Sequence, residues 1–224
     1  MLNEGYILIN KKERVQMSSS IDFSSPAIQF SFDVNKSQLF KKDQQNFINV
    51  LGVNELNSLK NLSMLDTYLS KGNIVEPHYH QNAAELVYCI SGSAVVSIFH
   101  PFMKQLMNFT IMPGQVVNVP QGWWHYIEAQ TDHTHFLAIF DSNTPEVILG
   151  SDLLKFTPPS IMARTYCMDE NQWKHAVAPV KPATFIGPHK DCHAHHHYQQ
   201  PYQVQFPHHQ VPVNHQHKNY PFYS

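Results

Sequence analysis

The chain has 224 residues and a formal net charge of −2, with 15 basic residues against 17 acidic ones. This length fits one domain with additions better than two full domains. Arg14 and Arg164 are the only arginines and no basic stripe is visible, so we expect no nucleic-acid partner. No secretory signal and no run of about 18 apolar residues is present, which predicts a cytoplasmic protein without a membrane partner.

The first part of the chain reads as a leader followed by many short strands. Residues 1–25 are polar and serine-rich, which predicts a flexible leader. Apolar and polar residues then alternate over 28–32 and 47–51, as in strands. Seven further β-rich segments follow, separated by turn signals: 64–69, 85–90, 94–99, 105–111, 115–119, 124–129 and 135–140. This pattern predicts an all-β fold, an antiparallel jelly-roll barrel, because closure hides strand edges and encloses a cavity.

The pattern changes after residue 141. Segments 149–156 and 169–178 read as short helices, the second with an acidic first turn, and we expect them to cap the barrel domain of residues 26–186. From 187 to 224 the chain holds nine of its sixteen histidines, with five prolines and six glutamines. This composition predicts a disordered tail with weak affinity for cations.

The three cysteines suggest no disulfide or thiolate metal site. Cys89, Cys167 and Cys192 form neither an even set nor a CxxC pair, which favours a reducing compartment. Cys89 lies in an apolar strand and is interpreted as a small buried side chain rather than a nucleophile.

Three histidines and one glutamate stand at spacings suited to a metal site. His78 and His80 project to the same face of a strand, so both imidazoles can reach one ion. Glu85 follows at an odd offset, so the chain must bend and Glu85 is expected on a neighbouring strand. His125 comes from a distant strand after a Pro-x-Gly turn. Nitrogen and oxygen donors without thiolate suit Mn, Fe, Ni, Cu or Zn, with open positions left for water or substrate.

The glycines and the proline around these residues complete two motifs. They are G-x5-H-x-H-x4-E-x6-G from Gly72 to Gly92 and G-x5-P-x-G-x2-H from Gly114 to His125. Together they resemble the motifs of the cupin family, and residues 80–92 and 120–128 resemble a single domain of oxalate decarboxylases and germin-like proteins. The resemblance implies a jelly-roll barrel, a homodimer, and one metal ion, manganese in those enzymes, bound by the three histidines and the glutamate.

Two positions depart from the oxalate decarboxylase pattern. That pattern has a substrate-binding arginine three residues before the first ligand histidine, where this chain has Val75. An isopropyl group cannot form the two-pronged contact that a guanidinium makes with a carboxylate. The lid that carries a proton-donating glutamate in those enzymes is here a short segment ending at Glu146, which is therefore the candidate acid unless it is simply a solvated surface carboxylate.

Side chains near the motifs are less informative. Trp123 and Trp124 either shape the mouth of a pocket or pack against neighbouring strands. His133 and His135 repeat the His-x-His spacing but have no carboxylate at the matching distance in sequence, so they are interpreted as surface or rim residues.

Two functions from different classes remain open. In the first, the chain is a metal-binding structural protein whose tail drives assembly, because that tail resembles the His- and Tyr-rich tails of bacterial spore-coat proteins; this also allows a spore-coat location. In the second, it is an Mn- or Fe-dependent decarboxylase, oxidase or dioxygenase that acts on a small carboxylic acid such as oxalate. Val75 and the unusual tail favour the first.

Overall fold

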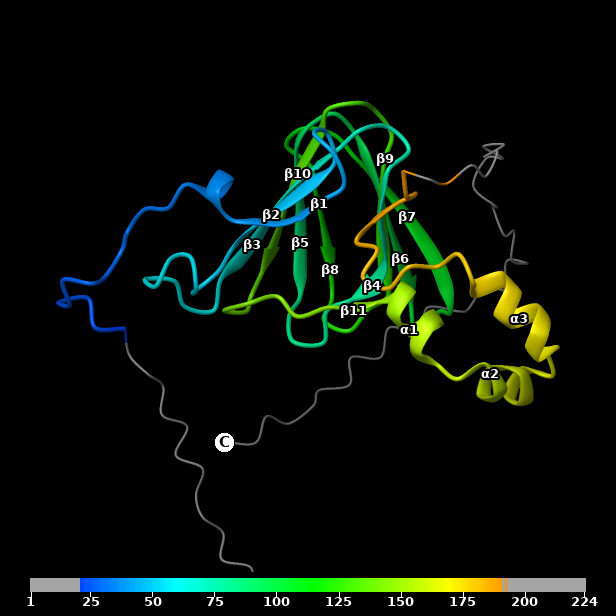
Figure 1. Cartoon of the computed structure of the whole chain (residues 1–224). Helices are drawn as coiled ribbons and strands as arrows, with labels where there is room; N and C mark the ends of the chain where they lie inside the picture. Colours follow the sequence, from blue (N-terminus) through cyan, green and yellow to red (C-terminus); the bar gives the residue numbers. More distant parts are fainter. Residues whose placement is uncertain (1–20, 191, 193–224) are drawn as a thin grey trace, which may run out of the picture. The chain divides into compact units, whose positions relative to one another are not determined.

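The computed structural model describes residues 21–190 and 192 (Figure 1). The predicted leader up to residue 20 and the predicted tail from residue 193 lie outside the described residues. The described part is mostly β, with two antiparallel sheets that face each other, and this confirms the expected fold class. None of the described helices is long and apolar enough to span a membrane.

Each sheet combines strands from distant parts of the chain. The first sheet has the order β1 (Gln38–Lys41), β2 (Phe47–Leu51), β3 (Ser63–Leu69), β10 (Thr134–Phe140), β5 (Glu85–Ser91) and β8 (Val116–Val119). The second has the order β11 (Ile148–Leu149), β4 (Ile74–Tyr79), β9 (His125–Ala129), β6 (Ala94–His100) and β7 (Gln105–Ile111), with β12 (Ile186–Gly187) also paired to β4. Consecutive strands β4 and β5 therefore belong to opposite sheets.

The core fills the space between the sheets. Strand residues alternate between this core and the outer faces, as a period of two requires. In β5, Val87 and Cys89 are fully buried, whereas Tyr88 between them is 38% exposed. Burial raises the pKa of the Cys89 thiol, which agrees with its interpretation as a packing residue. The core also includes Val96 and Phe136 from the two sheets.

Several elements differ from the sequence-based prediction. Residues 28–32 form no strand: the Gln29 amide donates to the Asn57 side chain, and Phe30 is 71% exposed, so the apolar alternation faces no core. Strand β1 was not expected, because only Phe40 of its four residues packs on the core. The 3₁₀ helix η1 (Val34–Lys36) precedes it.

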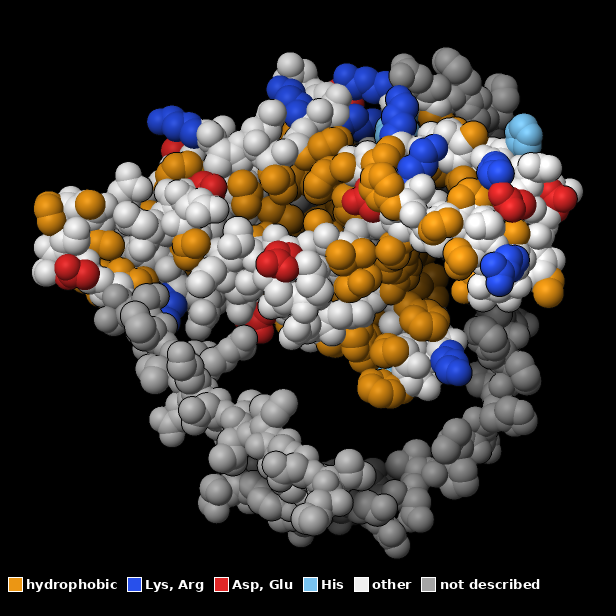
Figure 2. All heavy atoms as spheres, turned by 60° about the horizontal axis from the view of Figure 1, so that its bottom comes forward, with side chains coloured by type: hydrophobic (Ala, Val, Ile, Leu, Met, Phe, Trp, Pro, Cys, Tyr) orange, Lys and Arg blue, Asp and Glu red, His pale blue; other side chains and the backbone are white. Residues whose placement is uncertain are grey.

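Three short helices follow the last strand of the first sheet. They are α1 (Gly150–Phe156), α2 (Pro159–Tyr166) and α3 (Glu170–Val177). The predicted helices correspond to α1 and α3, whereas α2 was missed; it begins with Pro159 in the first turn, where the absent N–H costs nothing. Helices α1 and α2 leave large apolar side chains exposed, among them Leu153, Phe156, Ile161 and Tyr166. Figure 2 shows apolar side chains gathered on the face that is seen from below in Figure 1.

Gly92 shows why a motif position requires glycine. Its φ is +71°, in the left-handed region that residues with a side chain rarely adopt. A Cβ added there would stand 2.7 Å from the Thr134 Cα, so the turn that joins β5 to β6 also lies directly against the start of β10. The other three motif glycines have positive φ as well.

Glu76 ties the helices to the strand that carries the histidines. Its side chain is buried at 6% exposure and accepts hydrogen bonds from the Ser151 amide (2.8 Å), the Ser151 hydroxyl (3.0 Å) and the Phe185 amide (2.8 Å). Ser151 lies in α1, and Phe185 precedes β12. One carboxylate therefore satisfies three donors and joins β4, α1 and the returning chain.

We expect Glu76→Gln to destabilise the fold. The amide NH2 of glutamine would face backbone N–H donors that now meet a carboxylate oxygen, so the free energy of unfolding should fall by about 1–3 kcal/mol. Urea unfolding of the metal-free protein measures it. Glu128→Gln on the neighbouring strand β9 is the matched control and should leave stability unchanged; equal stability of both variants would contradict the role of Glu76.

Candidate metal centre

The four predicted ligands meet at one end of the space between the sheets. His78 on β4 and His125 on β9 are directly paired in register, and His80 follows the end of β4. Glu85 is the first residue of β5, which belongs to the other sheet. Glu85 is thus on the next strand in the sequence, as expected, but this strand is not beside β4 in its sheet. Residues 81–84 cross from the second sheet to the first.

The geometry of the four side chains fits a single small cation. Their ligand atoms all lie within 4.8 Å of one another. Glu85 Oε2 is 2.7 Å from His125 Nε2 and 3.3 Å from His80 Nε2. The four residues are between 0% and 4% exposed, so a carboxylate and three imidazoles are removed from water together. A metal ion is the partner that such a buried nitrogen and oxygen set can hold.

Backbone carbonyls orient all three imidazoles in the same way. The Nδ1 atoms of His78, His80 and His125 lie 2.6, 2.7 and 2.9 Å from the carbonyl oxygens of Glu76, Glu146 and Trp123. A carbonyl oxygen only accepts, so each Nδ1 carries the proton and each Nε2 is left for the centre. This second layer of hydrogen bonds is typical of histidines that bind metals.

The comparisons with known proteins agree with this arrangement. The family model described as "Cupin" matches residues 33–174, which is more than half of the chain. The chain belongs to the cupin family. Among curated proteins it is 30% identical to "Germin-like protein 1-2" of Oryza sativa subsp. japonica over 122 residues, or 52% of this chain and 54% of that protein. It is 28% identical to "Oxalate decarboxylase OxdC" of Bacillus subtilis (strain 168) over 142 residues, or 62% and 36%.

Other relatives and a solved structure extend the likeness. "Glycinin G3" of Glycine max is 25% identical over 126 residues, or 55% of this chain and 26% of that protein. A structure of oxalate decarboxylase from Bacillus subtilis at pH 4.6 superposes with a TM-score of 0.63 at 23% identity, over 72% of this chain and 42% of that one, and shows the fold. The chain thus spans about half or less of the length of these relatives.

The protonation states of the four clustered side chains favour the binding of a cation. Burial, reinforced by the nearby His125, lowers the pKa of His78 to about 3, so this imidazole is neutral. Burial opposes ionisation of Glu85, but His125 and His80 outweigh it and lower the pKa of Glu85 well below its usual range. Glu85 in turn raises the pKa of His125 against the effect of burial. The pair is therefore held in its charged form, and a metal ion would replace the His125 proton.

Glu146, the predicted acid, contributes to the centre through its backbone. Its carbonyl accepts from His80 Nδ1, whereas its exposed carboxylate accepts from the Gln81 side chain at 2.9 Å. Asn82 fastens the same segment by accepting from the Glu146 amide and donating to the Thr144 carbonyl. The catalytic role of Glu146 stays a prediction; its positioning role could not be read from the sequence.

Val75 lies within the apolar packing of the second sheet. It is paired with Ile127 of β9 and Ile186 of β12 and packs against the core. The single arginine of the described residues, Arg164, is exposed on α2. Neither of the two motifs contains an arginine that could replace the missing guanidinium.

Trp123, Trp124 and His135 all contact neighbouring side chains or backbone of the fold. Trp123 packs on the core, with its ring 4.8 Å from that of His100, and Trp124 lies 3.1 Å from where a Cβ on Gly150 would stand. These contacts favour the packing interpretation. His135 has a carboxylate partner that its sequence spacing did not indicate: His135 Nε2 is 2.6 Å from Asp66 Oδ1. The pairing of β10 with β3 joins residues 69 positions apart, which local spacing cannot reveal.

The lowered pKa of His78 predicts a specific pH dependence of the metal-free protein. In the unfolded chain this histidine binds a proton near pH 6.5, but in the folded protein only near 3, so stability is lost as pH falls through this window. Between pH 7 and 5 its share of the loss should be about 2 kcal/mol.

The measurement is urea unfolding of wild type and His78→Gln at both pH values. The variant lacks the titrating imidazole, so its free energy of unfolding should fall by about 2 kcal/mol less than that of wild type between pH 7 and 5. His133→Gln, an exposed histidine, is the control and should behave as wild type. Parallel pH profiles for wild type and His78→Gln would show that the burial of His78 does not set its protonation.

Proposed function

We propose that this cupin binds one divalent transition-metal ion through Nε2 of His78, His80 and His125 and the carboxylate of Glu85, and that the ion serves structure and assembly rather than turnover. The observation that carries the proposal is the origin of the ligands in both sheets. An ion held by all four would cross-link the sandwich at the end where β4 passes over to β5. We expect manganese first, and Fe, Ni, Cu and Zn can use the same donors.

The cost of burying the cluster supports this proposal. An ionised carboxylate and imidazoles that lack water are destabilising unless they are paired. Glu85 is paired with His125 and His80, but His78 has its Nε2 without a protein hydrogen-bond donor among the described contacts. A bound cation would satisfy all four side chains together and so favour the folded state.

Metal binding should therefore raise the stability of the protein. With free metal at about 100 times Kd, the free energy of unfolding should rise by about 2.7 kcal/mol, with one ion per chain by elemental analysis. His78→Ala and Glu85→Gln should lose both the ion and the increase, whereas His133→Ala should keep both. Full metal content without any gain in stability would contradict the structural role.

A second candidate is a metal-dependent enzyme acting on a small carboxylic acid such as oxalate. The complete ligand set and the similarity to oxalate decarboxylase favour it. A bound ion would supply a Lewis acid to such chemistry, but Val75 supplies no guanidinium to bind a second carboxylate, and Arg164, the one arginine of the described residues, lies on α2. Oxalate consumption and oxygen uptake by the manganese-loaded protein decide between the candidates: turnover that disappears in His78→Ala would overturn the structural proposal.

The assembly part of the proposal concerns the tail and a homodimer. Tyrosines and histidines between 193 and 224 would mediate contacts between copies in a layer such as a spore coat, after synthesis in the cytoplasm. Exposed apolar side chains on α1 and α2 support a surface that a second copy covers. No nucleic acid or membrane takes part in this proposal.

Truncation tests the assembly role if the stop is placed after Cys192. A cut at Gly187 would remove part of β12 and disturb its pairing with β4. We expect the truncated protein to keep its metal content and unfolding free energy but to form smaller species by light scattering and sedimentation. Unchanged assembly would contradict the role of the tail without affecting the metal proposal.

A further inference from the structure

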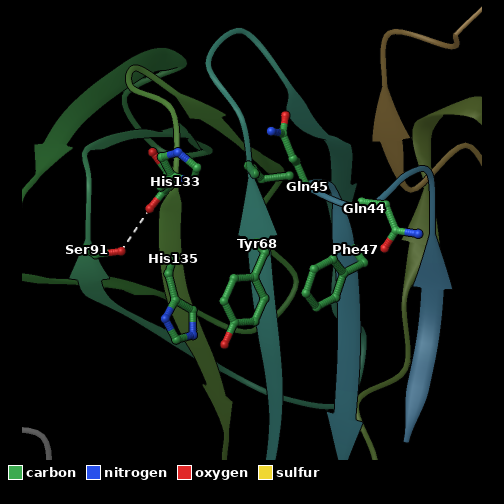
Figure 3. A pocket seen from close by; sticks show the side chains of 9 residues that line it. Gln44, Gln45, Phe47, Tyr68, Ser91, His133 and His135 are labelled. Carbon is green, nitrogen blue, oxygen red and sulfur yellow. Dashed lines mark hydrogen bonds between the residues drawn. The ribbon is translucent and has the colours of Figure 1, made fainter. Parts of the chain in front are cut away.

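A trough lies on the outer face of the first sheet, away from the metal centre (Figure 3). It has a volume of about 370 Å³ and is lined at its floor by Phe47, Tyr68 and His135. The metal centre contacts the last residue of β10, where the Phe140 ring meets His80, whereas His135 stands near the start of that strand. Five strand steps, about 17 Å, separate the two positions along β10.

The floor of the trough is a row of three stacked rings. Phe47, Tyr68 and His135 are directly paired in register on β2, β3 and β10. Ring centroids are 4.6 Å apart between Phe47 and Tyr68 and 4.0 Å apart between Tyr68 and His135, with planes within 18° of parallel. Figure 3 shows the three side chains side by side on adjacent strands. They form a continuous strip of ring faces about 10 Å across, since strands lie about 4.8 Å apart.

Buried polar contacts hold this strip in place. His135 Nε2 is 2.6 Å from Asp66 Oδ1, and the second oxygen of Asp66 accepts from the Asn49 side chain at 3.4 Å. Asp66 is only 4% exposed. The imidazole of His135 is thus oriented by a buried carboxylate two residues before Tyr68 on β3, which is already engaged by His135 and Asn49.

The walls carry hydrogen-bonding groups that are free to bind. Gln44 and Gln45 come from the exposed turn between β1 and β2, and Gln44 Oε1 already accepts from Lys41 Nζ at 3.3 Å. Within the described part of the chain, neither the Gln45 side chain nor the His133 imidazole has a hydrogen-bond partner. An amide both donates and accepts, as does a neutral imidazole.

The chemistry of the lining selects an uncharged ligand. Among the described residues that line the trough none is Lys, Arg, Asp or Glu, and the charges beside it, Lys41 and Asp66, already contact Gln44 and His135. Aromatic rings pack against the C–H faces of a sugar, and amide and imidazole groups match its hydroxyls, which both donate and accept. The volume is at the lower end of the range of about 300–1,000 Å³ for small-ligand sites. We propose that this trough binds a neutral saccharide of one or two rings.

The test is saturation-transfer NMR on the full-length, manganese-free protein with maltose, cellobiose and N,N′-diacetylchitobiose as probes. We expect transfer to at least one of these sugars, with binding weakened about fivefold or more in Tyr68→Ala. Tyr68→Phe, which keeps the ring, should bind nearly as wild type. Tyr88→Ala removes an exposed ring of the same sheet outside the trough and should change nothing, and His78→Ala should also bind normally.

A second variant guards against loss of folding. If Tyr68→Ala unfolds, the exposed Gln45→Ala should still weaken binding. The proposal is overturned if none of the three sugars shows transfer, if transfer is equal in wild type and both trough variants, or if p-cresol binds at the trough and the sugars do not. The last result would identify a site for flat aromatic rings instead.

Discussion

The contact between Glu85 Oε2 and His125 Nε2, 2.7 Å long and fully buried, is the interaction on which the rest of the site depends. It joins the first residue of β5, in one sheet, to the first residue of β9, in the other, and it can form only because residues 81–84 cross from β4 to β5. A buried carboxylate in this position requires positive partners around it. His125 and His80 supply these partners, both within 3.3 Å of the same Glu85 oxygen.

Backbone carbonyl groups orient the ligands of the centre. Three carbonyl groups, from Glu76, Trp123 and Glu146, set the imidazole orientations. Two of them precede their histidine by two residues, so the local course of the chain provides them. The third, the Glu146 carbonyl, comes from the segment after β10, 66 positions from His80. The position of that segment therefore affects the orientation of the His80 ring. A change in this segment would therefore reach the centre without altering any ligand.

Sequence periodicity and motif spacing were enough to predict the two-sheet fold class, most of the strands and the gathering of the four candidate ligands. These features are local, because an alternating pattern or a glycine turn acts over a few residues. The features that were missed depend on long-range pairing. The Asp66–His135 contact needs β3 beside β10, Glu76 needs α1 and the chain before β12, and the stretch at 28–32 failed as a strand because no neighbouring strand meets it.

The position of Val75 argues that metal binding and carboxylate chemistry are separable in this cupin. Its side chain is partly buried and packs against the core cluster that includes Ile127 and Ile186. An arginine placed there would bring a guanidinium into that packing, and a buried cation without a partner is strongly destabilising. Exchange of this one residue would therefore place a cation against an apolar surface that a valine now covers. The ligand set needs no such adjustment, since its four side chains and three carbonyls are complete without residue 75.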